Sequence, residues 1–248
     1  MRYIAILVLT LLFNCKEQQA EKLSAQEIID TSFEVSGSDK VRNAKITYNF
    51  RGVRYKAVRN EGAFELSRKF QKDSKLIEDR LSNKGFERYI NNKLVTLADS
   101  IANGFSASVN SVHYFSVLPY GLNDAAVNKA IVTDTEIKNS NYTALKVTFD
   151  QIGGGEDFED EFVYWINKNS FKVDFLAYSY HEADGKGMRF REAYNERYVE
   201  GIRFVDYNNY KPKNNSVDLI DLPNLFEAGT LELVSKIELK NVRVTLLE

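Results

Sequence analysis

The sequence has few residues that cross-link a chain or ligate a metal. Its 248 residues include one cysteine, three prolines and two histidines. A single cysteine cannot form a disulfide within the chain, and it excludes a zinc site built from several cysteines. The histidines, His113 and His181, stand in no metalloprotease, nucleophile-elbow or phosphate-loop motif. We therefore expect no metal, no cofactor and no enzymatic activity.

The sequence also lacks an excess of charge of either sign. Lysine and arginine number 33 against 35 for aspartate and glutamate, which gives a formal net charge of −2. A nucleic-acid interface needs clustered basic residues, so we expect no nucleic-acid partner. Hydrophobic residues make up 44% of the chain, enough for the core of one large domain. The 14 tyrosines and 16 phenylalanines suit sheet faces and apolar pockets.

One hydrophobic run begins the chain, at residues 4–13. It is too short to cross a bilayer, which takes about 20 helical residues, and it has the form of a secretory signal. Cys15 follows and resembles the lipobox cysteine of bacterial lipoproteins; Asn14 departs from the usual small residue, a position at which Bacteroidetes lipoproteins vary. The resemblance implies a signal peptide at 1–14 and a lipidated tether at 15–23. An ordinary secretory signal that leaves Cys15 as a free thiol stays open.

Acylation of Cys15 would attach the protein to a membrane, because several acyl chains supply the two signals that stable anchoring requires. The lipoprotein resemblance thus implies a cell-envelope protein anchored to the outer membrane, facing either the periplasm or the cell surface. We expect residues 24–248 to form a single β domain and the protein to be a monomer.

Most of that domain has the alternating pattern of short amphipathic strands separated by short turns, which predicts an antiparallel meander. Residues 162–166 are apolar at every position, so we expect a central strand covered on both sides. Residues 233–239 and 242–246 are expected to pair with each other at the end of the chain, with a bulge between them.

Two segments have helical spacing instead. Ser24 and Glu27 form a capping box, which predicts an early helix that ends at Gly37. The longer segment, 99–131, is predicted to be a helix up to Pro119 followed by a second short helix. One face of the longer helix carries five apolar side chains: Ile101, Phe105, Val109, Val112 and Phe115.

Four blocks of sequence resemble a family of uncharacterised flavobacterial lipoproteins: SAQEIIDTSFEVSG, SVNSVHYFSVLPYGLNDAAVNKA, GGGEDFEDEFVYWINK and VDFLAYSYHEADGKGMRFREAYNERYVEGIRFVDYNNY. More distantly, the order of lipid anchor, early helix, meander and helical segment resembles the LolA/LolB/LppX-like fold. That resemblance implies a mainly β (α+β) fold, in which a strongly curved antiparallel sheet, or incomplete β-barrel, holds helices in its concave face. It also implies that acyl chains bind there.

The candidate ligand-binding residues follow from this expected arrangement. The candidate wall of an apolar cavity consists of Ile101, Phe105, Val112, Phe115, Trp165, Tyr178, Tyr180 and Phe190. Pairing of Ser179 with Arg189 would place His181, Arg189 and Arg191 together on the other face of the hairpin, where they could bind a carboxylate or phosphate headgroup. Because the tyrosine face is the more apolar one, this register favours burial of the aromatic side chains and exposure of the arginines.

Three functions are compatible with the sequence. The first is a membrane-anchored lipoprotein that binds a lipid, an acyl chain or another amphiphile in the concave face. The second is a non-enzymatic cell-surface interaction protein whose core is filled by its own helix. The third is a hydrolase that uses His181 with Asp174 or Glu182. The acidic loop Glu156 to Glu161 could bind a cation, although an exposed, hydrated loop is the favoured interpretation.

Overall fold

The computed structural model describes residues 22–153, 160–182 and 185–248. The first antiparallel sheet has the order β14-β1-β2-β3-β4-β5-β6 and consists of Ala44–Phe50 (β1), Val53–Asn60 (β2), Ala63–Lys72 (β3), Lys75–Ser82 (β4), Gly85–Ile90 (β5), Lys93–Val95 (β6) and Lys240–Leu246 (β14). The second has the order β13-β12-β11-β10-β9-β8-β7 and consists of Val127–Ile137 (β7), Ser140–Phe149 (β8), Glu161–Asn167 (β9), Val173–Glu182 (β10), Gly185–Val199 (β11), Ile202–Lys211 (β12) and Glu232–Ile237 (β13).

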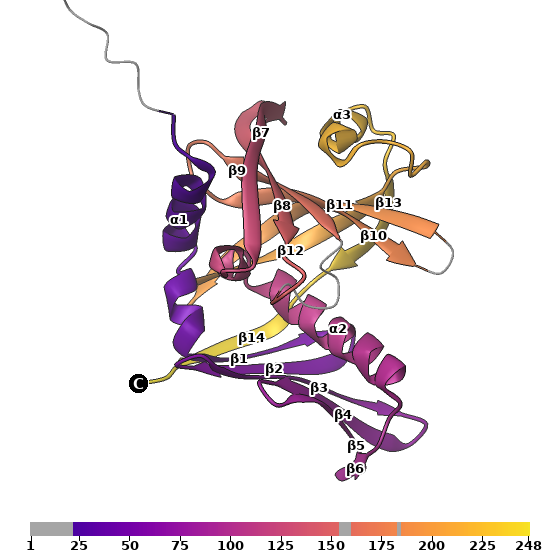
Figure 1. Cartoon of the computed structure of the whole chain (residues 1–248). Helices are drawn as coiled ribbons and strands as arrows, with labels where there is room; N and C mark the ends of the chain where they lie inside the picture. The colour runs from indigo at the N-terminus through magenta and orange to yellow at the C-terminus, as the bar shows by residue number, and fades with distance from the viewer. Residues whose placement is uncertain (1–21, 154–159, 183–184) are drawn as a thin grey trace, which may run out of the picture.

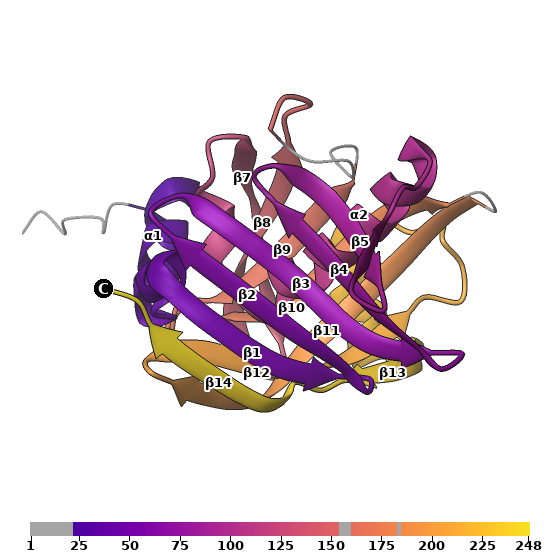
Figure 2. The same cartoon turned by 90° about the horizontal axis from the view of Figure 1, so that it is seen from below.

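The sheets form two layers that enclose the long helix. Figure 1 shows α2 (Asp99–Ser116) between the sheets, α3 (Leu222–Glu227) over the far side of the second sheet, and α1 (Ala25–Val35) at one end of both layers. Figure 2 shows the first sheet lying across the second when the molecule is seen from below. Three short 3-10 helices complete the fold: Ser38–Asn43 (η1), Tyr120–Asn123 (η2) and Leu219–Asp221 (η3). The predicted fold class is confirmed, with the strands divided between two sheets that do not close into a barrel in the described part of the chain.

The end of the chain connects the two sheets, and here the predicted strand pairing is wrong. β13 pairs with β12 and β14 pairs with β1, so the two last strands belong to different sheets. The chain crosses at Leu239, whose N–H donates to Asp206 Oδ1 (2.9 Å) and whose carbonyl accepts from Arg197 Nη2 (2.7 Å). An alternating pattern predicts which face of a strand is apolar, but it does not predict which strand lies beside it.

The early helix begins and ends as predicted. The Ser24 N–H donates to Glu27 Oε2 (2.7 Å), and the Glu27 N–H donates to Ser24 Oγ (3.2 Å), so the capping box is complete. Gly37 follows the helix with a φ of 62°. A Cβ atom at Gly37 would lie 1.9 Å from the carbonyl oxygen of Gly201, so only glycine fits where the chain passes β12.

The segment after α2 differs from the prediction. The expected short helix through Ile131 is absent: η2 is followed directly by β7, which pairs with β8 along its length. The β-branched residues Val132, Thr133 and Thr135 favour this extended conformation. The helix thus ends at Ser116, and the chain turns into the outermost strand of the second sheet.

The second sheet is covered on both faces. Every side chain from Phe162 to Ile166 in β9 is buried, which confirms the predicted central strand. The inner face carries a cluster that includes Leu145, Tyr164 and Leu176, with α2 residues packed against it. The outer face carries a separate cluster in which η3 and α3 cover β8 to β11.

Candidate functional site: a cavity beside helix α2

A cavity of about 690 Å³ lies between α2 and the inner face of the second sheet. Its walls come from α2 and strands β8 to β13, and Phe50 at the end of β1 and Arg51 in the following turn also line it. The apolar part of the lining includes Val112, Phe115 and Val205. Ligand cavities in proteins span about 300–1,000 Å³, so this one has room for a molecule the size of an acyl chain.

The register of the β10–β11 hairpin decides which side chains enter the cavity. The prediction that Ser179 pairs with Arg189 is wrong: Ser179 pairs with Met188, and Arg189 pairs with Tyr178. Paired residues point to the same face. The single-residue shift therefore places tyrosines and arginines together on the inner face, and Tyr178, Tyr180, Arg189 and Arg191 all line the cavity.

Arg191 lies inside the cavity with only 8% of its surface exposed. Its Nη2 donates to the Tyr178 hydroxyl (2.7 Å) and its Nε to Asn209 Oδ1 (3.4 Å). Its guanidinium carbon lies 4.0 Å from the ring centroid of Phe115 and 5.0 Å from that of Tyr178. Among the described residues Arg191 forms no ion pair with a carboxylate, so its charge is balanced only by neutral oxygens and aromatic rings.

Aromatic side chains form the apolar wall next to Arg191. The Tyr178 ring lies 5.5 Å from that of Phe162, nearly parallel to it, and 5.4 Å from that of Phe115. Tyr207, which also lines the cavity, is almost fully buried, and burial raises the pKa of its hydroxyl. The hydroxyl therefore keeps its proton, and it makes no hydrogen bond to another described residue, so it can donate to a ligand.

The mouth of the cavity carries further positive charge. Arg189 is half-buried, donates from Nη1 to the Met188 carbonyl (2.7 Å) and lies 5.2 Å from the Tyr180 ring centroid. Arg51 is exposed and donates to Ser235 Oγ (3.2 Å). Asp160 is the acidic residue in the described lining, against three arginines. The described lining thus combines apolar walls with an excess of guanidinium groups, which form strong hydrogen bonds with carboxylates and phosphates.

The remaining cavity candidates lie elsewhere. Ile101 is 51% exposed near the start of α2. The Phe105 ring packs near that of Phe86, and the guanidinium carbon of Arg88 lies 3.4 Å from its centroid. Trp165 and Phe190 are fully buried in the outer cluster beneath α3. Val112 and Phe115 are thus the two candidates on α2 that reach the cavity.

Other lining residues were missed by the sequence reasoning. Val205, Tyr207 and Asn209 enter from β12, and Phe149 and Phe162 enter from β8 and β9. The alternation of Val205, Tyr207 and Asn209 is a usable signal for a shared face. It does not say that this face borders a cavity, because a filled core gives the same pattern.

His113 anchors α2 to the first sheet. It is 1% exposed, with Nδ1 3.2 Å from the Tyr48 hydroxyl and Nε2 3.1 Å from the Ser67 carbonyl oxygen. Burial lowers the pKa of His113 to about 3, so the ring is neutral at physiological pH. With Nε2 donating to the carbonyl, Nδ1 accepts from Tyr48. This histidine holds the helix that borders the cavity and does not reach the cavity itself.

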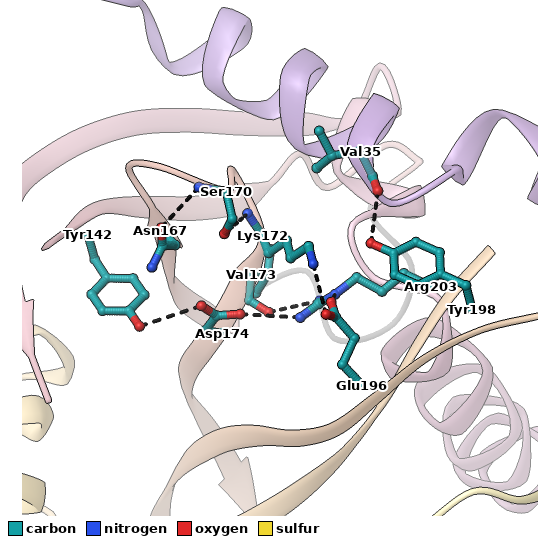
Figure 3. Close-up of polar contacts among 10 residues, drawn as sticks. All are labelled: Val35, Tyr142, Asn167, Ser170, Lys172, Val173, Asp174, Glu196, Tyr198 and Arg203. Atoms are coloured by element: carbon teal, nitrogen blue, oxygen red, sulfur yellow. Dashed lines mark hydrogen bonds and ion pairs between the residues drawn. The ribbon is translucent and has the colours of Figure 1, made fainter. Parts of the chain in front are cut away.

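Asp174 is not placed beside His181, as one form of the third function requires. Asp174 and His181 stand seven positions apart in β10, about 20 Å along the strand. Figure 3 shows Asp174 instead in a polar network with Arg203 and Tyr142: Oδ1 accepts from Arg203 Nη2 (3.2 Å) and Oδ2 from the Tyr142 hydroxyl (3.5 Å). Burial raises the pKa of Asp174, and the charge of Arg203 lowers it in part. The side chains of His181 and Glu182 lie outside the described residues.

Several further predictions also fall outside the described part of the chain. Cys15 and the signal peptide precede residue 22, and residues 156–159 of the acidic loop are not described. Within the described residues no cluster of histidine, cysteine, aspartate and glutamate has the arrangement of a metal site. No described helix is long and apolar enough to span a membrane.

Comparison with known proteins gives one family and several similar structures. Residues 2–239 match a family described as "Family of unknown function (DUF6503)", and no curated protein matches the chain. The chain is similar to a LolA superfamily protein from Nitrosomonas europaea, with 10% identity over 92% of this chain and 94% of that chain and a TM-score of 0.48.

Two further structures are of related kinds. One is a putative outer membrane lipoprotein-sorting protein domain from Vibrio parahaemolyticus, with 9% identity over 88% of this chain and 93% of that chain and a TM-score of 0.42. The other is the lipoprotein LppX from Mycobacterium tuberculosis, with 10% identity over 66% of this chain and 92% of that chain and a TM-score of 0.30. These are proteins of the kinds named by the more distant sequence resemblance.

Proposed function

This chain belongs to the DUF6503 family, whose function is unknown, and we propose that it is a non-enzymatic binding protein for an anionic amphiphile. The ligand is a lipid or fatty acid with a carboxylate or phosphate headgroup. Its chain lies along the aromatic wall of the cavity beside α2, and its headgroup binds Arg191. The observation that carries the proposal is a buried arginine inside a cavity of about 690 Å³ that pairs with no carboxylate among the described residues.

The energetics of Arg191 support this assignment. A buried charge is costly unless it is paired, and an isolated guanidinium does not lower that cost by losing its proton. Cation–π contacts with Phe115 and Tyr178 offset part of the cost. An anionic headgroup would supply the missing partner, with the Tyr207 hydroxyl as a second donor. A cavity that served only as an imperfect core would gain nothing from an arginine at this position.

A binding experiment with matched lipids tests the proposal. Palmitate, methyl palmitate and hexadecanol differ in the head but share the chain, so displacement of a fluorescent fatty acid separates charge from hydrophobicity. We expect palmitate to bind at least about tenfold more tightly than the two neutral lipids, and R191L to remove that difference. R54Q is the matched control, since Arg54 is an exposed arginine outside the cavity lining.

A second variant distinguishes the cavity from the surface. Val112 faces the cavity from α2 and is half-buried, so V112W fills space that the acyl chain would occupy. We expect V112W to weaken all three lipids together. Unchanged palmitate affinity in both R191L and V112W would exclude this cavity as the binding site.

We also propose that Cys15 is acylated and holds the domain on a membrane of the cell envelope. The support is the apolar run at residues 4–13 directly before the single cysteine. Mass spectrometry of the protein from isolated membranes should find a mature chain that begins at Cys15 and carries fatty acids. A C15S variant should appear in the soluble fraction. A wild-type N-terminus without fatty acid would contradict the anchor but leave the cavity proposal unaffected.

A further inference from the structure

A second cavity, of about 330 Å³, lies on the other side of the C-terminal half of α2. Asn110 and Tyr114 line both cavities, so this part of the helix forms the wall between them. The second cavity is bordered by β2, by the turn and first residues of β3, and by η2. Its lining contains two arginines, Arg42 and Arg59, and one acid, Asp124.

Arg59 is only 9% exposed, and among the described residues it interacts with the Asp124 carboxylate only through longer-range electrostatics, without an ion pair. Its Nη1 is fully buried and makes no hydrogen bond. Within the described ranges its side chain forms no hydrogen bond or ion pair, and its nearest support is the Tyr120 ring, whose centroid lies 5.2 Å from the guanidinium carbon. Burial lowers the pKa of Arg59, the direction expected for a charge held away from water.

Comparison with Arg203 shows how unusual this arrangement is. Arg203 is 4% exposed and its guanidinium donates to Glu196 Oε1 (2.5 Å), the Val173 carbonyl (3.0 Å) and Asp174 Oδ1 (3.2 Å). A buried guanidinium that lacks such acceptors loses the free energy of each hydrogen bond that it cannot make. A group that binds at Arg59 and accepts hydrogen bonds would recover this free energy.

We infer that the second cavity is a binding site for a small organic carboxylate, held by Arg59 at its inner wall with Arg42 at its rim. The planar guanidinium matches a carboxylate by two parallel hydrogen bonds. The rest of the wall is apolar where Phe64, Leu66 and Val117 line it, so it suits a short aliphatic or aromatic group on the same molecule. The cavity has less than half the volume of the first, which favours a smaller ligand than a long acyl chain.

This site is separate from the one proposed for amphiphiles, and the two can be tested independently. Hexanoate and benzoate are the probes, inorganic phosphate is the comparison anion, and hexanol is the neutral control. Titration calorimetry and thermal unfolding of the full domain should show hexanoate or benzoate binding at millimolar or lower concentration, with phosphate and hexanol at least about tenfold weaker.

Substitutions assign the binding to this cavity. R59M should remove one carboxylate-binding event and R42Q should weaken the same event several-fold, whereas R54Q should bind the probes as the wild type does. R59M removes a buried charge that has no ion-pair partner among the described residues, so we expect the variant to fold. If it does not fold, the effect of R42Q on binding tests the inference. Wild-type protein that binds neither carboxylate would overturn the inference, and so would full binding by R59M and R42Q. Loss of binding in R191L alone would assign the carboxylates to the first cavity instead.

Discussion

The two faces of the second sheet differ in how the space above them is filled. On the outer face, α3 and η3 cover Trp165, Phe175 and Phe190, all of which are buried, and the Phe226 ring lies 5.2 Å from that of Phe190. On the inner face, α2 leaves a cavity of about 690 Å³. A filled core and an open cavity therefore coexist in one domain, separated by the thickness of one sheet.

Two buried arginines of the second sheet differ in their partners. Arg203, in the network of Figure 3, binds Asp174 and Glu196, while Arg191 faces the cavity without a carboxylate partner in the described structure. Both arginines are buried in the same sheet. Arg203 is therefore paired within the fold, whereas Arg191 is the residue to which we assign the headgroup of a ligand. The outer face is thus a filled core, and the inner face has the cavity that the proposed binding function requires.

The largest expected effect is loss of packing on the outer face. F190A removes a fully buried ring, and we expect it to lower the free energy of unfolding by about 3–5 kcal/mol. Y180A truncates a half-buried side chain that borders the cavity, and its effect should be about 1 kcal/mol or less. Urea denaturation measures both values. Equal losses in the two variants would mean that the inner face is packed as a core.

The two arginines provide a second contrast. R203L leaves Asp174 and Glu196 without their shared partner, and we expect a loss of about 3 kcal/mol in unfolding free energy. R191L removes a charge that has no ionic partner in the described part of the chain, so stability should be unchanged or slightly higher. Thermal and urea unfolding of both variants in the absence of lipid would decide. A destabilisation by R191L as large as that by R203L would make Arg191 a structural residue.

A smaller effect concerns the attachment of α2 to the first sheet. The pKa of His113 is about 3 in the folded protein against an ordinary value of 6.5, so folding favours the neutral ring. This contribution is complete above about pH 6.5 and declines as the pH falls towards 3, by about 1.4 kcal/mol per unit. Between pH 6.5 and 5 the wild type should lose about 2 kcal/mol more than H113F, which cannot titrate. Parallel stability curves for the two proteins across that range would show that His113 becomes protonated without cost to the fold.

The class of the fold could be predicted from the sequence, but the pairing of its strands could not. The capping box at Ser24 and the apolar run 162–166 depend on local spacing, and both are as predicted. Whether Tyr178 lies opposite Arg189 depends on the loop that joins β10 to β11, and one residue more or less there changes which side chains share a face. Segment 127–131 has apolar residues compatible with either a helix or a strand, and pairing with β8 determines the outcome.

The cavity was beyond prediction for a different reason. Periodicity shows that Val112 and Phe115 face something apolar, but the volume left beside them depends on how far α2 stands from a sheet formed much later in the chain. The partner of a buried arginine is equally non-local. Arg203 pairs with Asp174, which lies 29 positions away in the sequence, whereas Arg191 pairs with no carboxylate in the described structure.

The central claim is that the inner face of the second sheet holds an anionic amphiphile by Arg191. A crystal structure of the domain with palmitate brominated at its terminal carbon tests this most directly, since the anomalous signal of bromine locates the end of the chain. We predict a carboxylate within hydrogen-bond distance of the Arg191 guanidinium and a bromine peak between α2 and the second sheet. A bromine peak outside that cavity, or a cavity closed by its own side chains, would contradict the claim.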